Sequence, residues 1–188
     1  MSSQQSRWVL SAVVALTLSG GGPLRAAEYQ AQAQSGNHLT FNAEQQGAEF
    51  QGRFEKFSAR LVIDADQPDR NCLEATIDLN SVNTEYQERD EYLRGEEWFN
   101  VAKWPTAQFT TSSLKAAGDG RYLADAQLTL RDVTHPVPME FSFDGQHFTG
   151  KAKLDRRVFG VGQGMWADER MVGAEVTVDV DIVFEPVN

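Results

Sequence analysis

The sequence predicts an all-β fold, either an antiparallel β-barrel or a β-sandwich. Three observations support this prediction: about nine short segments in which apolar and polar residues alternate, turn-forming residues between them, and one stretch with helical signals. Alternation with a period of two places the apolar side chains on one face of a strand. Many short strands separated by turns are typical of barrels and sandwiches. The 188 residues suffice for one domain of ordinary size.

The first 27 residues have the features of a signal peptide. Arg7 precedes the apolar run WVLSAVVALTL, residues 8–18, which is too short to span a bilayer. The sequence SGGGP follows this run and would break a helix, which favours an export signal over a core helix. We therefore expect cleavage near Ala26 or Ala27, a mature domain over residues 28–188, and a periplasmic location.

The mature chain is acidic. Without Arg7 and Arg25 it has 15 basic and 27 acidic residues, a formal charge near −12. Phosphate repels an acidic chain that lacks basic clusters, so we expect no nucleic-acid partner. Cys72 is the single cysteine of the sequence, which excludes an intramolecular disulfide.

The alternating segments of the mature chain are the predicted strands. They cover residues 39–43, 48–54, 57–63, 72–79, 107–111, 122–130, 137–143, 148–154 and 174–184. Many residues on their apolar faces are small: Ala43, Ala48, Gly52, Ala59, Ala75, Ala124, Ala126, Gly150, Ala152 and Ala174. A barrel of about eight strands is either filled by side chains or holds one small ligand. Small residues favour a ligand, but large neighbours could equally fill the gaps, so both alternatives stay open.

One segment, NTEYQERDEYLRGEEWF at residues 83–99, predicts a short helix between two strands. Thr84 and Gln87 have the spacing of a capping box, and Gly95 fits the end of the helix. Two pairs of opposite charge lie four residues apart, Glu85 with Arg89 and Asp90 with Arg94. The segment has more apolar residues than an exposed helix needs. We therefore expect the helix to lie against one end or one face of the sheet.

No motif of catalysis or metal binding is found. The histidines His38, His135 and His147 have no metal-ligand spacing, and GQGMWADER, residues 162–170, lacks the glycine pattern of a phosphate loop. We expect the latter to be a flexible loop between strands. The segment RDVTHP, residues 131–136, contains a histidine but reads as a corner between strands. We expect no catalytic residue, no metal ligand and no cofactor.

Four runs of the sequence resemble successive blocks of the YceI-like family of exported lipid-binding proteins. They are FEKFSARLVID, EYLRGEEWFNVAKWPTAQF, GRYLADAQLTLRDVTHPV and RRVFGVGQGMW. The blocks follow in the order and at the spacing of the family, and the likeness extends from about Leu39 to Phe184. One position departs from the pattern: Val158 stands where the family has an aspartate, between the matching Arg156 and Phe159.

This resemblance implies a lipocalin-like antiparallel β-barrel of about eight strands with one short inserted helix. It also implies an apolar tunnel that takes a polyisoprenoid lipid, such as an isoprenoid quinone tail, a prenyl alcohol or a prenyl diphosphate, and it implies no catalysis. RDVTHP then resembles the hairpin corner of the family. A membrane b-type cytochrome is a partner hypothesis by resemblance alone, and a homodimer is a further hypothesis.

The predicted ligand-binding residues are those expected to line the tunnel that the resemblance implies, or to lie near its mouth. For the tunnel lining we predict Phe41, Phe50, Phe54, Phe109, Leu128, Phe141, Phe143, Val178 and Ile182. Near the mouth or under the helix we predict Leu93, Trp98, Phe99, Phe159 and Trp166. Burial of one prenyl unit yields a gross ~3–4 kcal/mol, so a few units suffice for micromolar affinity. Two alternatives remain: an enzyme acting on a small lipophilic substrate in the same barrel, and a stress-response module whose barrel is filled.

Overall fold

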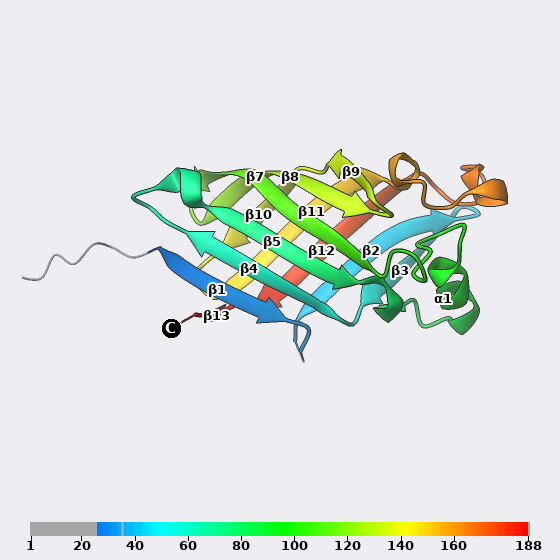
Figure 1. Ribbon diagram of the computed structural model, residues 1–188, viewed down its shortest axis with the longest axis horizontal. Helices are drawn as coiled ribbons and strands as arrows, with labels where there is room; N and C mark the ends of the chain where they lie inside the picture. Colours follow the sequence, from blue (N-terminus) through cyan, green and yellow to red (C-terminus); the bar gives the residue numbers. More distant parts are fainter. Residues whose placement is uncertain (1–25, 35, 188) are drawn as a thin grey trace, which may run out of the picture.

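The structure, a computed structural model, describes residues 26–34 and 36–187. Apart from Ala26 and Ala27, the predicted signal peptide lies outside the described residues. The described strands form one continuous antiparallel sheet that curls around a long axis (Figure 1). The strands are β1 (Ala27–Gln32), β2 (His38–Gln45), β3 (Ala48–Phe54), β4 (Phe57–Ile63), β5 (Cys72–Asp78), β6 (Val82–Asn83), β7 (Thr106–Gly118), β8 (Arg121–Leu130), β9 (Val133–Pro136), β10 (Met139–Phe143), β11 (His147–Asp155), β12 (Glu175–Val183) and β13 (Glu185–Pro186).

All nine predicted strands are present, as β2–β5, β7, β8 and β10–β12. The described sheet has 13 strands, because four further strands had no clear alternating pattern. β6 and β13 have two residues each, too few to show a period. β1 reads AEYQAQ, which has few large apolar residues, and β9 lies within RDVTHP, where only a corner was expected.

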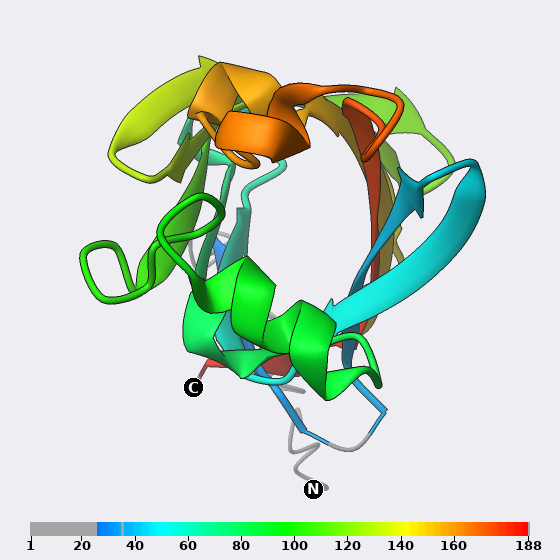
Figure 2. The ribbon, with the colours of Figure 1, turned by 90° about the vertical axis from the view of Figure 1, so that its right-hand side faces the viewer.

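The sheet closes into a barrel through short strands at its two ends. Hydrogen bonds join the strands in the order β13-β1-β4-β5-β7-β8-β10-β11-β12-β2-β3-β6, with β9 beside β8. β13 continues from β12 and pairs with β1 at Tyr29 and Pro186, which closes one end. β6 follows β5 in the chain and pairs with β3 at Phe54 and Val82, which closes the other. Figure 2 shows the resulting ring of strands from the end that carries the helix. The predicted barrel is confirmed, and a two-layer sandwich is excluded.

RDVTHP is a hairpin corner, as the resemblance implied. Arg131 and Asp132 have φ angles of 54° and 60°, as the two central residues of a type I′ turn require. Leu130 and Val133 flank this turn as the first pair of the β8–β9 ladder. The Arg131 guanidinium is buried and donates a hydrogen bond to the carbonyl oxygen of Trp98. This hydrogen bond joins the corner to the segment that follows the helix. Burial lowers the pKa of Arg131.

The predicted helix is present as α1 (Gln87–Arg94), at one end of the barrel, and ends at Gly95 as predicted, but the predicted capping box is wrong. The helix begins only at Gln87, so Thr84 lies too early to cap it. The Thr84 backbone N–H and hydroxyl instead donate to Asp90 Oδ1, at 2.8 and 2.7 Å. Neither predicted charge pair forms: Glu85 precedes the helix and pairs with Arg53 at 2.8 Å, and Asp90 accepts from Thr84. Arg94 donates to backbone carbonyls, those of Asn80 and Val82.

Aromatic rings fill the barrel at the end opposite α1. Phe141 stacks on Phe148 with a centroid distance of 4.5 Å, and Phe148 contacts Phe184 at 5.7 Å. Phe143 packs edge-on against Tyr29 at 4.9 Å, beside the β1–β13 pair. We call Tyr29, Tyr122, Phe141, Phe143, Phe148 and Phe184 the aromatic plug. One of its rings, Phe148, also lines the cavity described below.

Candidate ligand-binding cavity

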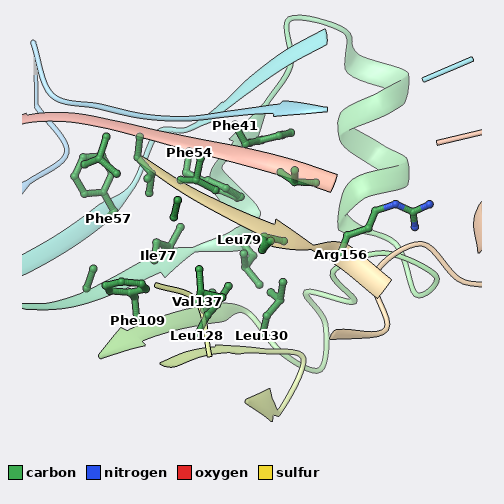
Figure 3. A pocket seen from close by; sticks show the side chains of 18 of the residues that line it. Phe41, Phe54, Phe57, Ile77, Leu79, Phe109, Leu128, Leu130, Val137 and Arg156 are labelled. Atoms are coloured by element: carbon green, nitrogen blue, oxygen red, sulfur yellow. The ribbon is translucent and has the colours of Figure 1, made fainter. Parts of the chain in front are cut away.

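A cavity of about 190 Å³ lies inside the barrel, and its walls expose only apolar atoms. Alternation along the strands creates these walls, because every second side chain points inward. On β12, for example, Val176, Val178, Val180 and Ile182 line the cavity. Asp179 pairs with Lys151 and Asp181 contacts His147 on the outside. Figure 3 shows Phe41, Phe54, Phe57, Ile77 and Leu128 among the side chains that surround this space.

Most residues predicted to bind ligand line this cavity. They are Phe41, Phe50, Phe54, Leu93, Trp98, Phe99, Phe109, Leu128, Val178 and Ile182. Four predicted residues do not line it. Phe141 and Phe143 point inward but belong to the aromatic plug. Phe159 is buried against β9, where its ring lies 5.4 Å from that of His135. Trp166 lies at the mouth, beside Trp98 and Tyr92.

Sequence reasoning missed other lining residues. These include Leu39, Phe57, Leu73, Ile77, Leu79, Leu130, Val137, Met139, Phe148, Leu154, Val161, Val172, Val176 and Val180. Most lie on the same alternating faces as the predicted ones, so the period-two signal was sufficient to find them. Val161 and Val172 lie outside the strands and carry no periodic signal.

The small inward residues have two different roles. Ala43, Ala59, Ala75 and Ala152 line the cavity and leave space in it. At Gly52 and Gly150 the space is filled instead: a Cβ atom on Gly52 would lie 2.3 Å from Phe41 Cζ, and one on Gly150 would lie 3.0 Å from Phe148 Cε1. The barrel is therefore partly hollow and partly filled by neighbouring rings.

Arg156 is the one polar side chain among the described residues that line the cavity. It is 2% exposed, and its five N–H groups donate to five backbone carbonyls at 2.6–3.2 Å. The acceptors belong to Val161, Gly162, Trp166, Val172 and Gly173. No ion pair of Arg156 with a carboxylate is present in the described part of the chain, and burial lowers its pKa. Its donors are used to hold the loop, which leaves none for a ligand.

The loop held by Arg156 forms one side of the mouth. It contains two 3₁₀ turns, η3 (Arg156–Phe159) and η4 (Gly164–Ala167), and η4 lies within the GQGMWADER segment. The backbone N–H groups of Gly162 and Gln163 both donate to the carbonyl oxygen of Glu97, at 2.8 Å each, which joins this loop to the segment after α1. Figure 2 shows α1 and the loop on opposite sides of the barrel end. Val158, at the departure from the family pattern, is 44% exposed on this loop.

The remaining polar candidates lie outside the cavity. His147 Nε2 lies 2.6 Å from Asp181 Oδ1 on the outer surface, and His38 and His135 do not line the cavity. In the described ranges no three His, Cys, Asp or Glu side chains are grouped as metal ligands. Likewise, none of the helices in that part of the chain is long and apolar enough to cross a membrane.

Comparison with known proteins agrees with this architecture. The protein YceI of Salmonella newport (strain SL254) is 36% identical over 141 residues, which cover 73% of this chain and 73% of that protein. The crystal structure of Burkholderia cenocepacia BcnA aligns with a TM-score of 0.70 and 27% identity over 78% of this chain and 95% of that one. A polyisoprenoid-binding domain from Saccharophagus degradans, implicated in plant cell wall breakdown, shares the fold, with a TM-score of 0.65 and 17% identity over 87% of this chain and 100% of that one. The family model of the YceI-like domain matches residues 29–184. The chain therefore belongs to the YceI-like family, as the four sequence blocks predicted.

Proposed function

We propose that this protein binds and carries a polyisoprenoid lipid, whose hydrocarbon tail enters the barrel from the end that carries α1. The observation that supports this most directly is the cavity itself, whose walls expose only apolar atoms. Each prenyl unit that leaves water for such a cavity contributes a gross ~3–4 kcal/mol. The shared fold with the polyisoprenoid-binding domain of Saccharophagus degradans also supports a lipid ligand.

The size of the cavity limits how the tail is held. A cavity of about 150 Å³ holds a benzene ring, so one of about 190 Å³ accepts roughly one prenyl unit without rearrangement. A longer tail requires the phenylalanine rings that line the cavity to change rotamer, as interface side chains commonly do on binding. Phe41, Phe54 and Phe57 are placed to do so, because all three line the cavity.

We propose a binding role rather than a catalytic one. Catalysis needs polar groups near the reacting atoms. Arg156 is the one polar residue among the described lining residues, and all its donors are bound to carbonyls. The proposal extends to a periplasmic location after removal of the segment up to residue 27, and to an isoprenoid quinone as one such lipid. A membrane b-type cytochrome that exchanges the quinone and a homodimer are further parts of this proposal.

Native mass spectrometry tests the proposal. The full chain would be expressed in an exporting bacterial host, purified without detergent and sprayed under native conditions. We expect an adduct whose mass corresponds to a polyprenyl compound and which is released by denaturation. A chain that carries no lipid adduct, and that binds no added prenyl compound in titration calorimetry, would contradict a carrier role and favour the filled-barrel module.

A further inference from the structure

The exposed apolar side chains of the described residues gather at one end of the barrel. Seven large apolar side chains in this part of the chain are at least 36% exposed. Two of them lie toward the aromatic plug: Leu123 adjoins Tyr122, and the Val187 N–H donates to Glu28 on β1. The other five belong to elements at the end that carries α1, and we call them the mouth rim: Tyr86, Tyr92, Val133, Val158 and Met165.

The mouth rim comes from three separate parts of the chain. Two of its residues belong to α1 and the position before it, one begins β9, and two lie on the 3₁₀ turns η3 and η4. Figure 2 shows α1 and the loop with these turns on opposite sides of the barrel end. The ring of Tyr92 on α1 lies 5.6 Å from that of Trp166 on η4, so the two sides meet. The fold thus assembles one apolar surface around the mouth.

The tryptophans of the described chain lie at the same end. They are Trp98, Trp104 and Trp166. Trp98 is buried beside Trp166, with their rings 5.7 Å apart, and the Arg131 guanidinium carbon lies 5.1 Å from the ring centroid of Trp104. Tryptophan and tyrosine favour the boundary between lipid and water, because their rings are apolar and their polar atoms stay near water. Their concentration around the mouth is typical of a surface that contacts a membrane.

The apolar cavity reaches this surface. Leu93 on α1, Trp98 after it and Val172 after η4 all line the cavity, and each belongs to a segment that carries or adjoins the mouth rim. A mouth rim that rests on a bilayer would therefore bring the cavity next to the hydrocarbon of the lipid. A tail could then pass between bilayer and barrel with little exposure to water, whose contact with apolar surface is unfavourable.

The charges around the mouth favour a zwitterionic membrane over an anionic one. Residues 85–104 include six acidic and three basic side chains, and residues 155–170 include three of each, which leaves a net charge of −3. In the loop, Arg157 and Arg170 pair with carboxylates of the same loop. On α1, Glu88 and Glu91 form no ion pair within the described ranges and accept from Tyr86 and Gln87. An anionic membrane attracts clusters of basic residues and repels a surface of this kind.

We propose that the mouth rim docks the protein on a bilayer of zwitterionic lipid, with Tyr92 and Met165 inserted at the boundary between head groups and hydrocarbon. This rests on the proposed function, because the docked mouth is where a lipid tail would enter or leave the barrel. It adds the membrane surface as a partner, and anionic lipid weakens the contact.

Tryptophan fluorescence with brominated lipid tests the docking. The full chain with Trp8→Phe would be expressed in the exporting host, so that its three tryptophans all lie at the mouth. We expect vesicles of brominated phosphatidylcholine to quench this fluorescence. Vesicles with phosphatidylglycerol in equal parts should bind about 3-fold or more weakly at low salt, and added salt should reduce the difference.

Surface variants in the same background locate the contact. Tyr92→Ser and Met165→Ser each remove an exposed apolar side chain of the mouth rim and should weaken vesicle binding about 3-fold or more. Neither residue lines the apolar cavity, so the affinity for a two-prenyl hydrocarbon in calorimetry should stay unchanged. The matched control is Leu123→Ser, since Leu123 is 48% exposed, close to the 51% of Tyr92, but lies toward the plug. This control should bind vesicles as tightly as the parent, and equal urea midpoints would show that all variants fold.

The outcomes separate docking from the proposed function. If the hydrocarbon binds in calorimetry but vesicles cause no quenching, the docking is wrong, the carrier stands, and a protein partner becomes the occupant of the mouth rim. Tighter binding to phosphatidylglycerol, or an equal loss in Leu123→Ser and Met165→Ser, would also contradict the docking. If vesicles bind through the mouth rim but no prenyl compound binds, the docking stands and the proposed function fails.

Discussion

The ring of Phe41 covers Gly52 across the β2–β3 pair. The two residues are direct partners in the ladder, and both are buried. A Cβ atom on Gly52 would lie 2.3 Å from Cζ and 2.6 Å from Cε1 of this ring, closer than any van der Waals contact allows. The absence of a side chain at Gly52 therefore sets the position of a ring that lines the apolar cavity.

Gly52→Ala is expected to displace the Phe41 ring into the cavity. Overpacking of this kind typically costs about 1–3 kcal/mol of unfolding free energy. The affinity for a prenyl hydrocarbon should fall at the same time, because the ring takes up part of the space for the tail. Urea unfolding and calorimetry measure the two effects. The neighbouring Gln51→Ala, on the exposed face, is the control and should change neither; equal effects of both variants would contradict this role of Gly52.

Ala152→Phe is expected to block the tail. Ala152 is 5% exposed, lines the cavity, and lies between Met139 and Val178 in the sheet. A phenyl ring there would occupy about the volume of one prenyl unit, so affinity for the tail should fall at least about tenfold. The matched control is Lys151→Phe, the next residue on the opposite face, whose side chain pairs with Asp179 at 3.0 Å. Unchanged binding by Ala152→Phe would place the tail outside the barrel.

Phe148→Ala is expected to lengthen the cavity into the aromatic plug. Phe148 is 1% exposed and both lines the cavity and stacks on Phe141. Its truncation should cost about 3–5 kcal/mol of unfolding free energy and shift the preferred tail to a longer one. Mass spectrometry of the lipids bound from a mixture of chain lengths gives the result. Phe159→Ala is the control: this residue is equally buried but does not line the cavity, so the stability should fall without a change in preferred length.

Arg156→Met is expected to disorder the loop at the mouth. The five carbonyls that accept hydrogen bonds from Arg156 would lose their donors inside the protein. The loss should be about 3–5 kcal/mol of unfolding free energy. Hydrogen exchange should rise in residues 161–173, as mass spectrometry would detect. Arg170→Met provides the comparison: it breaks an exposed ion pair with Asp168 and should change stability by less than about 1 kcal/mol. Equal stability of the two variants would contradict a structural role of Arg156.

The sequence predicted the features of this protein that depend on the pattern of neighbouring residues along the chain. Alternation with period two predicted all nine long strands and the faces that carry the cavity residues on β2, β3 and β12. The four runs that resemble the YceI-like family predicted the barrel and the corner at Arg131 and Asp132. The capping box of α1 was predicted wrongly, since Thr84 donates hydrogen bonds to Asp90 instead.

Tertiary structure alone decided which inward-facing residues leave space and which fill it. Phe41 and Phe141 both point inward from alternating strands, yet Phe41 lines the cavity and Phe141 belongs to the plug. The difference arises because a ring's surroundings depend on the register of strands far apart in the sequence and on the closing pairs β1–β13 and β3–β6. Periodicity is a property of one strand and fixes the face on which a side chain lies. The space that this side chain meets is a property of the whole closed sheet. The same holds for the carbonyls that accept from Arg156, and for Trp98 Nε1, which has no acceptor among the described residues.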